Sequence, residues 1–398
     1  MKRIEEFDGL RALAVAAVIA DHYAPFRTIG SGAAATLGTV GVDVFFVLSG
    51  YLITTILLGL KTAQYPYRIF YARRLLRILP PFALLLLLVY GGSAFLHEHI
   101  SKSKLVGQVL FLRSFHDTGE VFSRLLNVLD GHSRVPGLFS RLASGPISRD
   151  YPYLPLSGSL GPTWSLSVEE WFYILWAPIV LVCRRRAIAI VGILLCLMGF
   201  FIRWFTGSGS NFFATVDILI AGALLALWLQ HRRTLSLTQR SARDRLVTTV
   251  ALLSGFLFVL LCLLHRDRAA CSLIEIAVVG ALSWMVINSG TQHPMMTALR
   301  CKPAAYLGTI SYMTYLIHLP MYFVVRSALS RFTVGMPQTG AFWIVAICSV
   351  SATLLFAALS WRYFESPLLR LKDRLTELVT TEHADSPRSM AAGTVPQL

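Results

Sequence analysis

A cation and an imidazole share one face of an apolar segment near the N-terminus. Arg11 and His22 lie eleven residues apart at its two ends. At about 100° per residue, eleven positions make about three helical turns, so both side chains face one way, about 16 Å apart. A charged group in a membrane span costs about 3 kcal/mol or more, so it usually faces a protein cavity and is functional. The alternative is a snorkelling arginine and a packed histidine.

Acidic residues in two later segments are candidate partners of His22. Asp43 lies near the outer end of the second apolar segment, and Glu169 and Glu170 open a later one. A general-base histidine requires a carboxylate that orients it and stabilises its protonated form. Adjacent acids on a helix point about 100° apart, so we expect only one to face a cavity. We take Glu170 as catalytic because Tyr173 is on its face. The alternative is that these acids stabilise helix starts.

A polar stripe marks another apolar segment. Ser311, Tyr315 and His318 recur at i, i+4 and i+7, which places them on one face of a helix. Such donors can stabilise developing charge or hold a substrate. Alternatively, they join membrane helices, at about 0.6–2 kcal/mol each.

A basic cluster precedes two prolines. Arg74 and Arg77 are one turn apart, with Tyr71 on the same segment and Pro80 and Pro81 after it. Guanidinium groups suit phosphate because they offer paired N–H donors, which predicts an anion-binding site. The alternative is a surface patch that contacts anionic lipid. The prolines indicate a helix start or a kink.

The composition is that of a polytopic membrane protein. Of 398 residues, 55% are hydrophobic and 14% charged, and the mean hydropathy is +0.61. The net charge of +15 comes from Lys and Arg between apolar segments, which argues against nucleic-acid binding. The six cysteines show no CxxC spacing, so we expect neither a disulfide framework nor a metal site.

About ten apolar segments are long enough to span a bilayer, which predicts an all-α membrane bundle. They are 10–26, 35–60, 78–96, 163–183, 187–205, 211–230, 246–264, 271–289, 304–327 and 339–362. With ten spans and both termini cytoplasmic, most basic connections lie inside. If 104–114 also crossed, the arginines at 184–186 would move outside, so we expect it to be re-entrant or interfacial. No internal repeat is evident.

The expected domain organisation is simple. Residues 1–370 form one transmembrane domain, with 97–162 as a long extracytoplasmic connection. Residues 371–398 are polar and are expected to be a disordered cytoplasmic tail.

Six blocks in order resemble the acyltransferase 3 family of polytopic membrane proteins. They are FDGLRALAVAAVIADHY, GVDVFFVLSGYLI, FYARRLLRILP, TWSLSVEEWFY, LGTISYMTYLIHLP and SWRYFESP, and they extend over about residues 4–367. The family modifies hydroxyls of cell-surface and secreted sugars. One departure is Trp171, where similar proteins often carry Gln. Some relatives also carry an appended esterase-like domain, which we expect this chain to lack.

The resemblance implies transfer of an acyl group, commonly acetyl, from cytoplasmic acyl-coenzyme A to an acceptor at the outer face of the plasma or inner membrane. By the family pattern, His22 is the catalytic histidine, Arg11 is its partner, and Arg74 and Arg77 lie on the donor side. The rival interpretation is a transporter or flippase of a lipid-linked sugar. The missing repeat argues against it.

Overall fold

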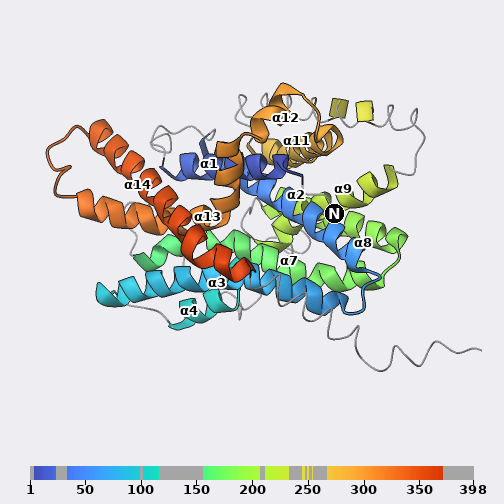
Figure 1. Ribbon diagram of the computed structural model, residues 1–398, viewed down its shortest axis with the longest axis horizontal. Helices are drawn as coiled ribbons and strands as arrows, with labels where there is room; N and C mark the ends of the chain where they lie inside the picture. Colours follow the sequence, from blue (N-terminus) through green and yellow to red (C-terminus); the bar gives the residue numbers. More distant parts are fainter. Residues whose placement is uncertain are drawn as a thin grey trace, which may run out of the picture.

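The computed structural model describes residues 4–23, 34–98, 102–115, 156–206, 211–232 and 267–370, with isolated positions between 244 and 253. Every regular element in these ranges is helical (Figure 1). The long helices are α1 (Glu6–Tyr23), α2 (Ala34–Leu60), α3 (Pro66–Phe95), α7 (Thr163–Val182), α8 (Arg185–Thr206), α9 (Phe212–Arg232), α11 (Asp267–Asn288), α13 (Lys302–Leu329) and α14 (Gln338–Ser360). The short elements are α4 (Lys102–Val109), η2 (Arg113–Phe115), η4 (Leu156–Leu160), α12 (Pro294–Leu299) and the π-helical η5 (Trp361–Glu365).

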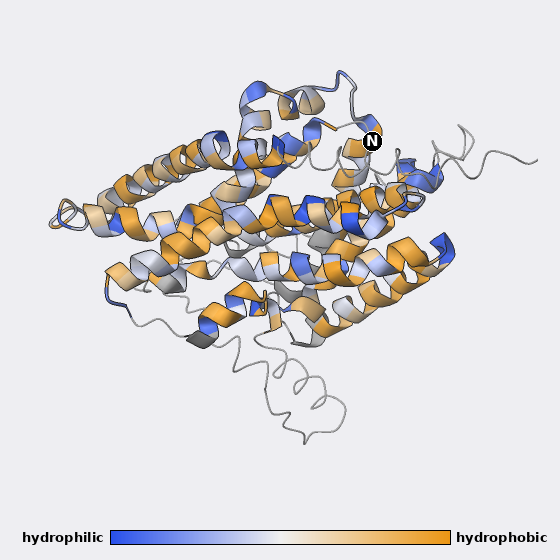
Figure 2. Cartoon of the chain, turned by 60° about the horizontal axis from the view of Figure 1, so that its bottom comes forward, coloured by the Kyte–Doolittle hydropathy of each residue, from blue (hydrophilic) through white to orange (hydrophobic). Residues whose placement is uncertain are grey.

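Six helices of the described ranges are long and apolar enough to cross a membrane: the spans are Leu37–Leu60, Pro66–Phe95, Thr163–Val182, Arg185–Ile202, Phe212–Arg232 and Thr339–Arg370. Apolar residues dominate these helices, whereas polar residues gather at helix ends and connections (Figure 2). About ten spans were expected. One of them, 246–264, lies outside the described residues except for isolated positions. The connection 116–155 and the tail from 371 also lie outside the described residues.

Several helix pairs pack with backbones in contact, which needs glycine at the crossing, and two of these crossings bear on the site. A Cβ at Gly50 of α2 would lie 1.8 Å from the Leu219 carbonyl oxygen of α9, and one at Gly222 would lie 2.0 Å from that of Val47. A Cβ at Gly308 of α13 would lie 1.8 Å from the Asp8 carbonyl oxygen of α1. These crossings fix α1 and α2, the helices that carry His22 and Asp43.

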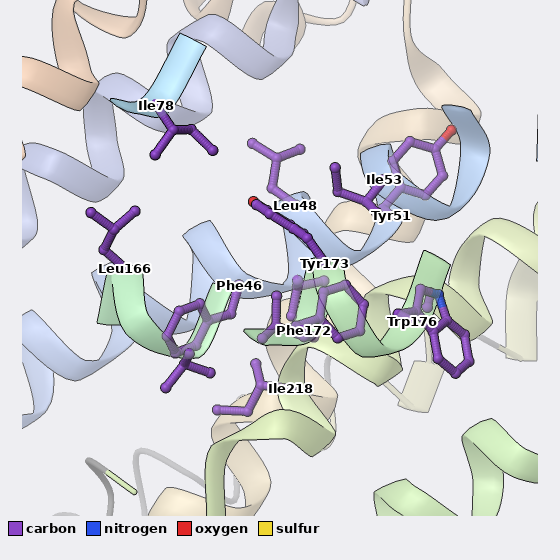
Figure 3. Packing of buried hydrophobic residues seen from close by; sticks show 14 of the residues in the cluster. Phe46, Leu48, Tyr51, Ile53, Ile78, Leu166, Phe172, Tyr173, Trp176 and Ile218 are labelled. Carbon is purple, nitrogen blue, oxygen red and sulfur yellow. The ribbon is translucent and has the colours of Figure 1, made fainter. Parts of the chain in front are cut away.

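The core lies among α2, α3, α7 and α9. Phe46, Leu48, Phe172 and Trp176 are almost fully buried there, and Figure 3 shows them together with Tyr173. Burial of a large apolar side chain contributes about 1.5–3 kcal/mol in water. Inside a bilayer this term is absent between helices, so tight packing and polar contacts, such as the 2.9 Å bond from Trp176 Nε1 to Thr54 Oγ1, hold the core together.

Two expected helix boundaries were wrong. The helix expected at 78–96 begins at Pro66, so Pro80 and Pro81 lie inside α3 rather than at its start. The first helix begins at Glu6 rather than at residue 10, because its acidic first turn is satisfied by neighbours. Glu6 Oε1 accepts a 2.8 Å hydrogen bond from Gly290 N and lies 3.6 Å from Arg300 Nη1.

The segment 104–114 forms two short elements, α4 and η2, and not one spanning helix. The Phe111 carbonyl between them accepts hydrogen bonds from Ser167 Oγ and from Trp171 Nε1, the latter at 3.0 Å. Phe111 has a positive φ of 54°, an uncommon conformation for a bulky residue. Trp171 thus fastens this segment to α7, which gives the departure from the family pattern a structural role.

Candidate active site

Three arginines meet where two cavities adjoin. Arg11 of α1 and Arg74 and Arg77 of α3 line both cavities, together with Leu52 and Tyr312. The wide cavity, of about 320 Å³, opens beside α1, α3 and η5, and the narrow cavity, of about 120 Å³, continues between α2, α7 and α13. The one-turn spacing of Arg74 and Arg77 directs both side chains to this junction.

The arginines differ in what balances their charge. Arg11 Nη1 donates a 2.8 Å hydrogen bond to Asp8 Oδ1, one turn earlier in α1. The Arg74 guanidinium lies 5.2 Å from the centroid of the Tyr173 ring, a cation–π contact. Among the described residues, no ion pair joins Arg74 or Arg77 to a carboxylate. Positive charge at the junction is therefore available to an anionic ligand.

Glu169, and not Glu170, is the carboxylate that lines the narrow cavity. Its Oε1 accepts a 2.6 Å hydrogen bond from Ser49 Oγ, and its Oε2 accepts one of 2.9 Å from the Tyr173 hydroxyl. Glu170 is buried and lines neither cavity, and its Oε1 has no hydrogen-bond partner in the described ranges. The two carboxylates point in different directions, as side chains at adjacent helical positions do. The i, i+4 spacing of Glu169 and Tyr173 was the overlooked sequence signal that Glu169 has a polar partner on its own helix.

Two of the three residues in the polar stripe of α13 line the narrow cavity, and the third, His318, does not. Ser311 and Tyr315 line the cavity, where Ser311 Oγ donates to the Gly308 carbonyl at 2.8 Å. The Tyr315 hydroxyl is 2.6 Å from Ser165 Oγ and donates to the Pro162 carbonyl at 3.1 Å. These bonds tie α13 to the start of α7 and place hydroxyl groups on the cavity wall.

Tyr71 is placed differently from the other predicted donor-side residues. Its hydroxyl lies 3.3 Å from the carbonyl oxygens of both Tyr173 and Ile174, so it joins α3 to α7. It lines neither cavity.

His22 and His318 form a pair of neighbouring histidines close to Tyr315. The ring centroids of His22 and His318 are 5.0 Å apart, and the Tyr315 ring is 5.7 Å from His318. His22 Nδ1 is 2.8 Å from the Val18 carbonyl oxygen, which can only accept, so Nδ1 carries a hydrogen. Asp43 is buried in α2, and its role as partner of His22 stays a prediction.

These features define a class of protein: a multi-pass helical membrane protein with a guanidinium cluster that lines two cavities and a pair of imidazoles that lies outside both cavity linings. A family comparison gives the particular member of that class. The chain belongs to the acyltransferase 3 family, whose model, described as an acyltransferase domain, matches residues 4–362.

Relatives within this family are named O-acetyltransferases. The peptidoglycan O-acetyltransferase OatA of Listeria monocytogenes is 28% identical over 389 residues, which cover 92% of this chain and 56% of the relative. YrhL of Bacillus subtilis, whose name assigns the same activity provisionally, is 28% identical over 92% of this chain and 55% of its own length. The chain thus spans about half the length of these relatives. No solved structure matches it.

Proposed function

We propose that the protein is a membrane O-acetyltransferase that moves an acetyl group from cytoplasmic acetyl-coenzyme A to a hydroxyl group of a carbohydrate at the outer face of the plasma or inner membrane. The observation that carries this proposal is the junction of the two cavities, where Arg11, Arg74 and Arg77 meet. Family membership supports acyl transfer, and the names of the relatives support acetyl as the group and a glycan such as peptidoglycan as the acceptor.

The arginines would bind the phosphate groups of the donor. Arg74 and Arg77 offer paired N–H donors without a carboxylate partner in the described ranges, and phosphate oxygens fit such groups. Arg11 and His22 are about 16 Å apart along α1 by helix geometry. A donor held at the arginines therefore needs a long, thin arm to reach the histidine. The pantetheine arm of coenzyme A has this form, and the narrow cavity would hold it.

His22 would act as the general base. Its Nε2 takes the proton of an acceptor hydroxyl, whose oxygen attacks the thioester carbonyl. A carbon–oxygen bond forms, the carbon–sulfur bond breaks, and the thiolate of coenzyme A leaves with a proton. Hydroxyl groups of the α13 stripe would stabilise the charge that develops on the carbonyl oxygen, and Arg11 would help to hold the donor. Because thiolate is a good leaving group, no acyl-enzyme intermediate is required.

Release of coenzyme A thiol tests this proposal. The purified protein in nanodiscs receives radiolabelled acetyl-coenzyme A and carbohydrate acceptors, beside His22→Ala. We expect thiol release with label on the acceptor, and a loss of about 100-fold or more in the variant, as for removal of a general base. Equal rates in both proteins would exclude His22 as the base. Label that stays on coenzyme A while a lipid-linked sugar crosses the bilayer would support a transporter instead.

A further inference from the structure

Glu365 is a buried carboxylate of the wide cavity that the transfer mechanism leaves unused. It is 7% exposed and belongs to the π-helical η5. Its Oε1 accepts a 2.9 Å hydrogen bond from Ser360 Oγ, and within the described ranges no hydrogen bond or ion pair reaches its Oε2. Ionisable groups inside membrane spans are costly and usually functional, so this carboxylate calls for a ligand.

The π-helix explains how Glu365 comes to face the cavity. Pro367 follows η5 and has no N–H with which to continue an α-helical ladder, and the Ser366 N–H bonds to the Trp361 carbonyl five residues earlier. Trp361 and Glu365 are four residues apart, about one turn, and both line the wide cavity. Single π-turns of this kind are frequent at functional sites.

The wide cavity has two kinds of lining group. Its arginines suit phosphate, whereas a carboxylate repels phosphate and must meet a hydrogen-bond donor of the ligand. Asp8, the other acid of this cavity, is already paired with Arg11. The flat apolar groups of the lining are Trp361, Pro80 and Pro81. Together with Glu365, they suit a flat ring that carries an N–H donor at its edge.

The order of groups along coenzyme A indicates which ring this is. The phosphates of coenzyme A stand between the adenosine and the pantetheine arm. Arg11, Arg74 and Arg77 line both cavities, so phosphates bound at the junction with the arm in the narrow cavity place the adenosine in the wide one. Adenine is flat and apolar on its faces, and its amino group carries two N–H donors.

We propose that Glu365 Oε2 accepts a hydrogen bond from the adenine amino group of acetyl-coenzyme A, while Trp361 contacts the face of the same base. The inference rests on the proposed function and adds a specificity-determining residue to it. A base such as guanine carries a carbonyl oxygen where adenine has the amino group. That oxygen would face the carboxylate with both groups accepting, so Glu365 selects adenine by repulsion as well as by attraction.

Binding of two nucleotides without turnover tests this site. The probes are coenzyme A and its 1,N6-etheno derivative, whose base has no amino hydrogen, and calorimetry of the full chain in nanodiscs measures each Kd. We expect the wild type to bind coenzyme A about tenfold or more tighter, as for a hydrogen bond to a charged group. Glu365→Leu should bind the two within about twofold of each other, because only coenzyme A loses a bond.

Three further variants separate the adenine contact from general effects. Glu365→Gln has the shape of glutamate and keeps an acceptor oxygen without the charge, so the preference should fall to about threefold. This isosteric variant also carries the test if Glu365→Leu does not fold. Trp361→Ala should weaken both nucleotides about tenfold, since stacking does not need the amino group. The matched control is Glu5→Gln, an exposed carboxylate that lines neither cavity, and it should keep both wild-type Kd values.

Several results would overturn the proposal. Equal binding of both nucleotides by the wild type would exclude recognition of the amino group. A wild-type preference that survives in Glu365→Leu would mean that the larger etheno base is rejected by shape elsewhere. A Glu365-dependent preference in a protein that never releases thiol would refute the proposed function and leave the adenine site standing. Normal thiol release with binding that ignores Glu365 would do the reverse, and folded wild type that binds no coenzyme A would refute both.

Discussion

At the residue scale, the charges at the cavity junction are held by contacts of different kinds. Arg11 is paired with Asp8, whereas Arg74 rests on the Tyr173 ring. An ion pair satisfies a guanidinium, but a cation–π contact leaves its N–H donors available. This difference suggests that Arg11 shapes the junction while Arg74 and Arg77 bind the ligand.

Removal of Arg77 should therefore weaken donor binding. We expect Arg77→Ala to raise the KM for acetyl-coenzyme A about 10- to 100-fold, because a charge-assisted hydrogen bond to phosphate contributes about 1.5–3 kcal/mol. Arg77→Lys should recover only part of this, since lysine lacks the paired donors. Steady-state thiol release at varied donor concentration measures both.

The matched control is Arg73→Ala on the same helix. Arg73 is exposed and lines neither cavity, so its removal should leave the KM for the donor unchanged. If Arg73→Ala and Arg77→Ala weaken binding equally, the cluster attracts the donor only as a diffuse basic surface.

The sequence identified most of these residues by type but not by direction. The one-turn spacing of Arg74 and Arg77 predicted an anion-binding site, because helical periodicity is local, but it did not predict that Arg11 lines the same cavities. Which of Glu169 and Glu170 faces the cavity depends on the rotation of α7 against α2, and no local pattern contains that angle. For the same reason, the approach of the His22 ring to the His318 ring became visible only once α1 lay against α13.

At the element scale, small residues decide how closely neighbouring helices approach, as at the α1–α13 and α2–α9 crossings. Hydropathy predicted the six helices of the described ranges that are long and apolar enough to cross a membrane, because a bilayer requires a minimum length of apolar chain. It misplaced the start of α3, since proline at a helix start and proline inside a membrane helix look alike in sequence. The glycine contacts between helices were not predicted at all, because they depend on which helices are neighbours.

The α1–α13 crossing gives a direct test of this dependence. Gly308→Ala would place a Cβ 1.8 Å from the Asp8 carbonyl oxygen, so α1 must move away. Arg11 and His22 are both carried by α1, so we expect the rate of acetyl transfer to fall at least tenfold. We also expect a lower Tm in detergent, because overpacking costs about 1–3 kcal/mol of stability.

Gly59→Ala in α2 is the control for helix propensity. No atom lies within 4 Å of the added Cβ, so the substitution should be neutral or stabilise by up to about 1 kcal/mol. Normal activity and Tm in Gly308→Ala would show that α1 and α13 do not approach as closely as described.

At the scale of the whole molecule, the arginine junction and the histidine pair lie at different positions along α1, since Arg11 is in its first half and His22 in its last turn. Glu6, at the start of α1, contacts Gly290 and Arg300, which precede α13, so both helices start on the same side. Arg11 is near these starts and His22 is at the end of α1. A donor entering from the α1 start and an acceptor from the opposite face would then meet between them.

Cysteine labelling at the two ends of α13 tests this orientation. The helix has 28 residues, so it is about 42 Å long and exceeds the bilayer core of about 30 Å. Cys301 precedes it and Val334 follows it, and both are exposed. In a chain whose other cysteines are serine, Cys301 should react with a membrane-impermeant maleimide only after permeabilisation. With Cys301 also replaced, Val334→Cys should react in intact cells.

The reverse pattern would put the arginine junction outside, beyond the reach of cytoplasmic coenzyme A, and would refute the direction of transfer. Labelling of both sites in intact cells would mean that α13 does not span.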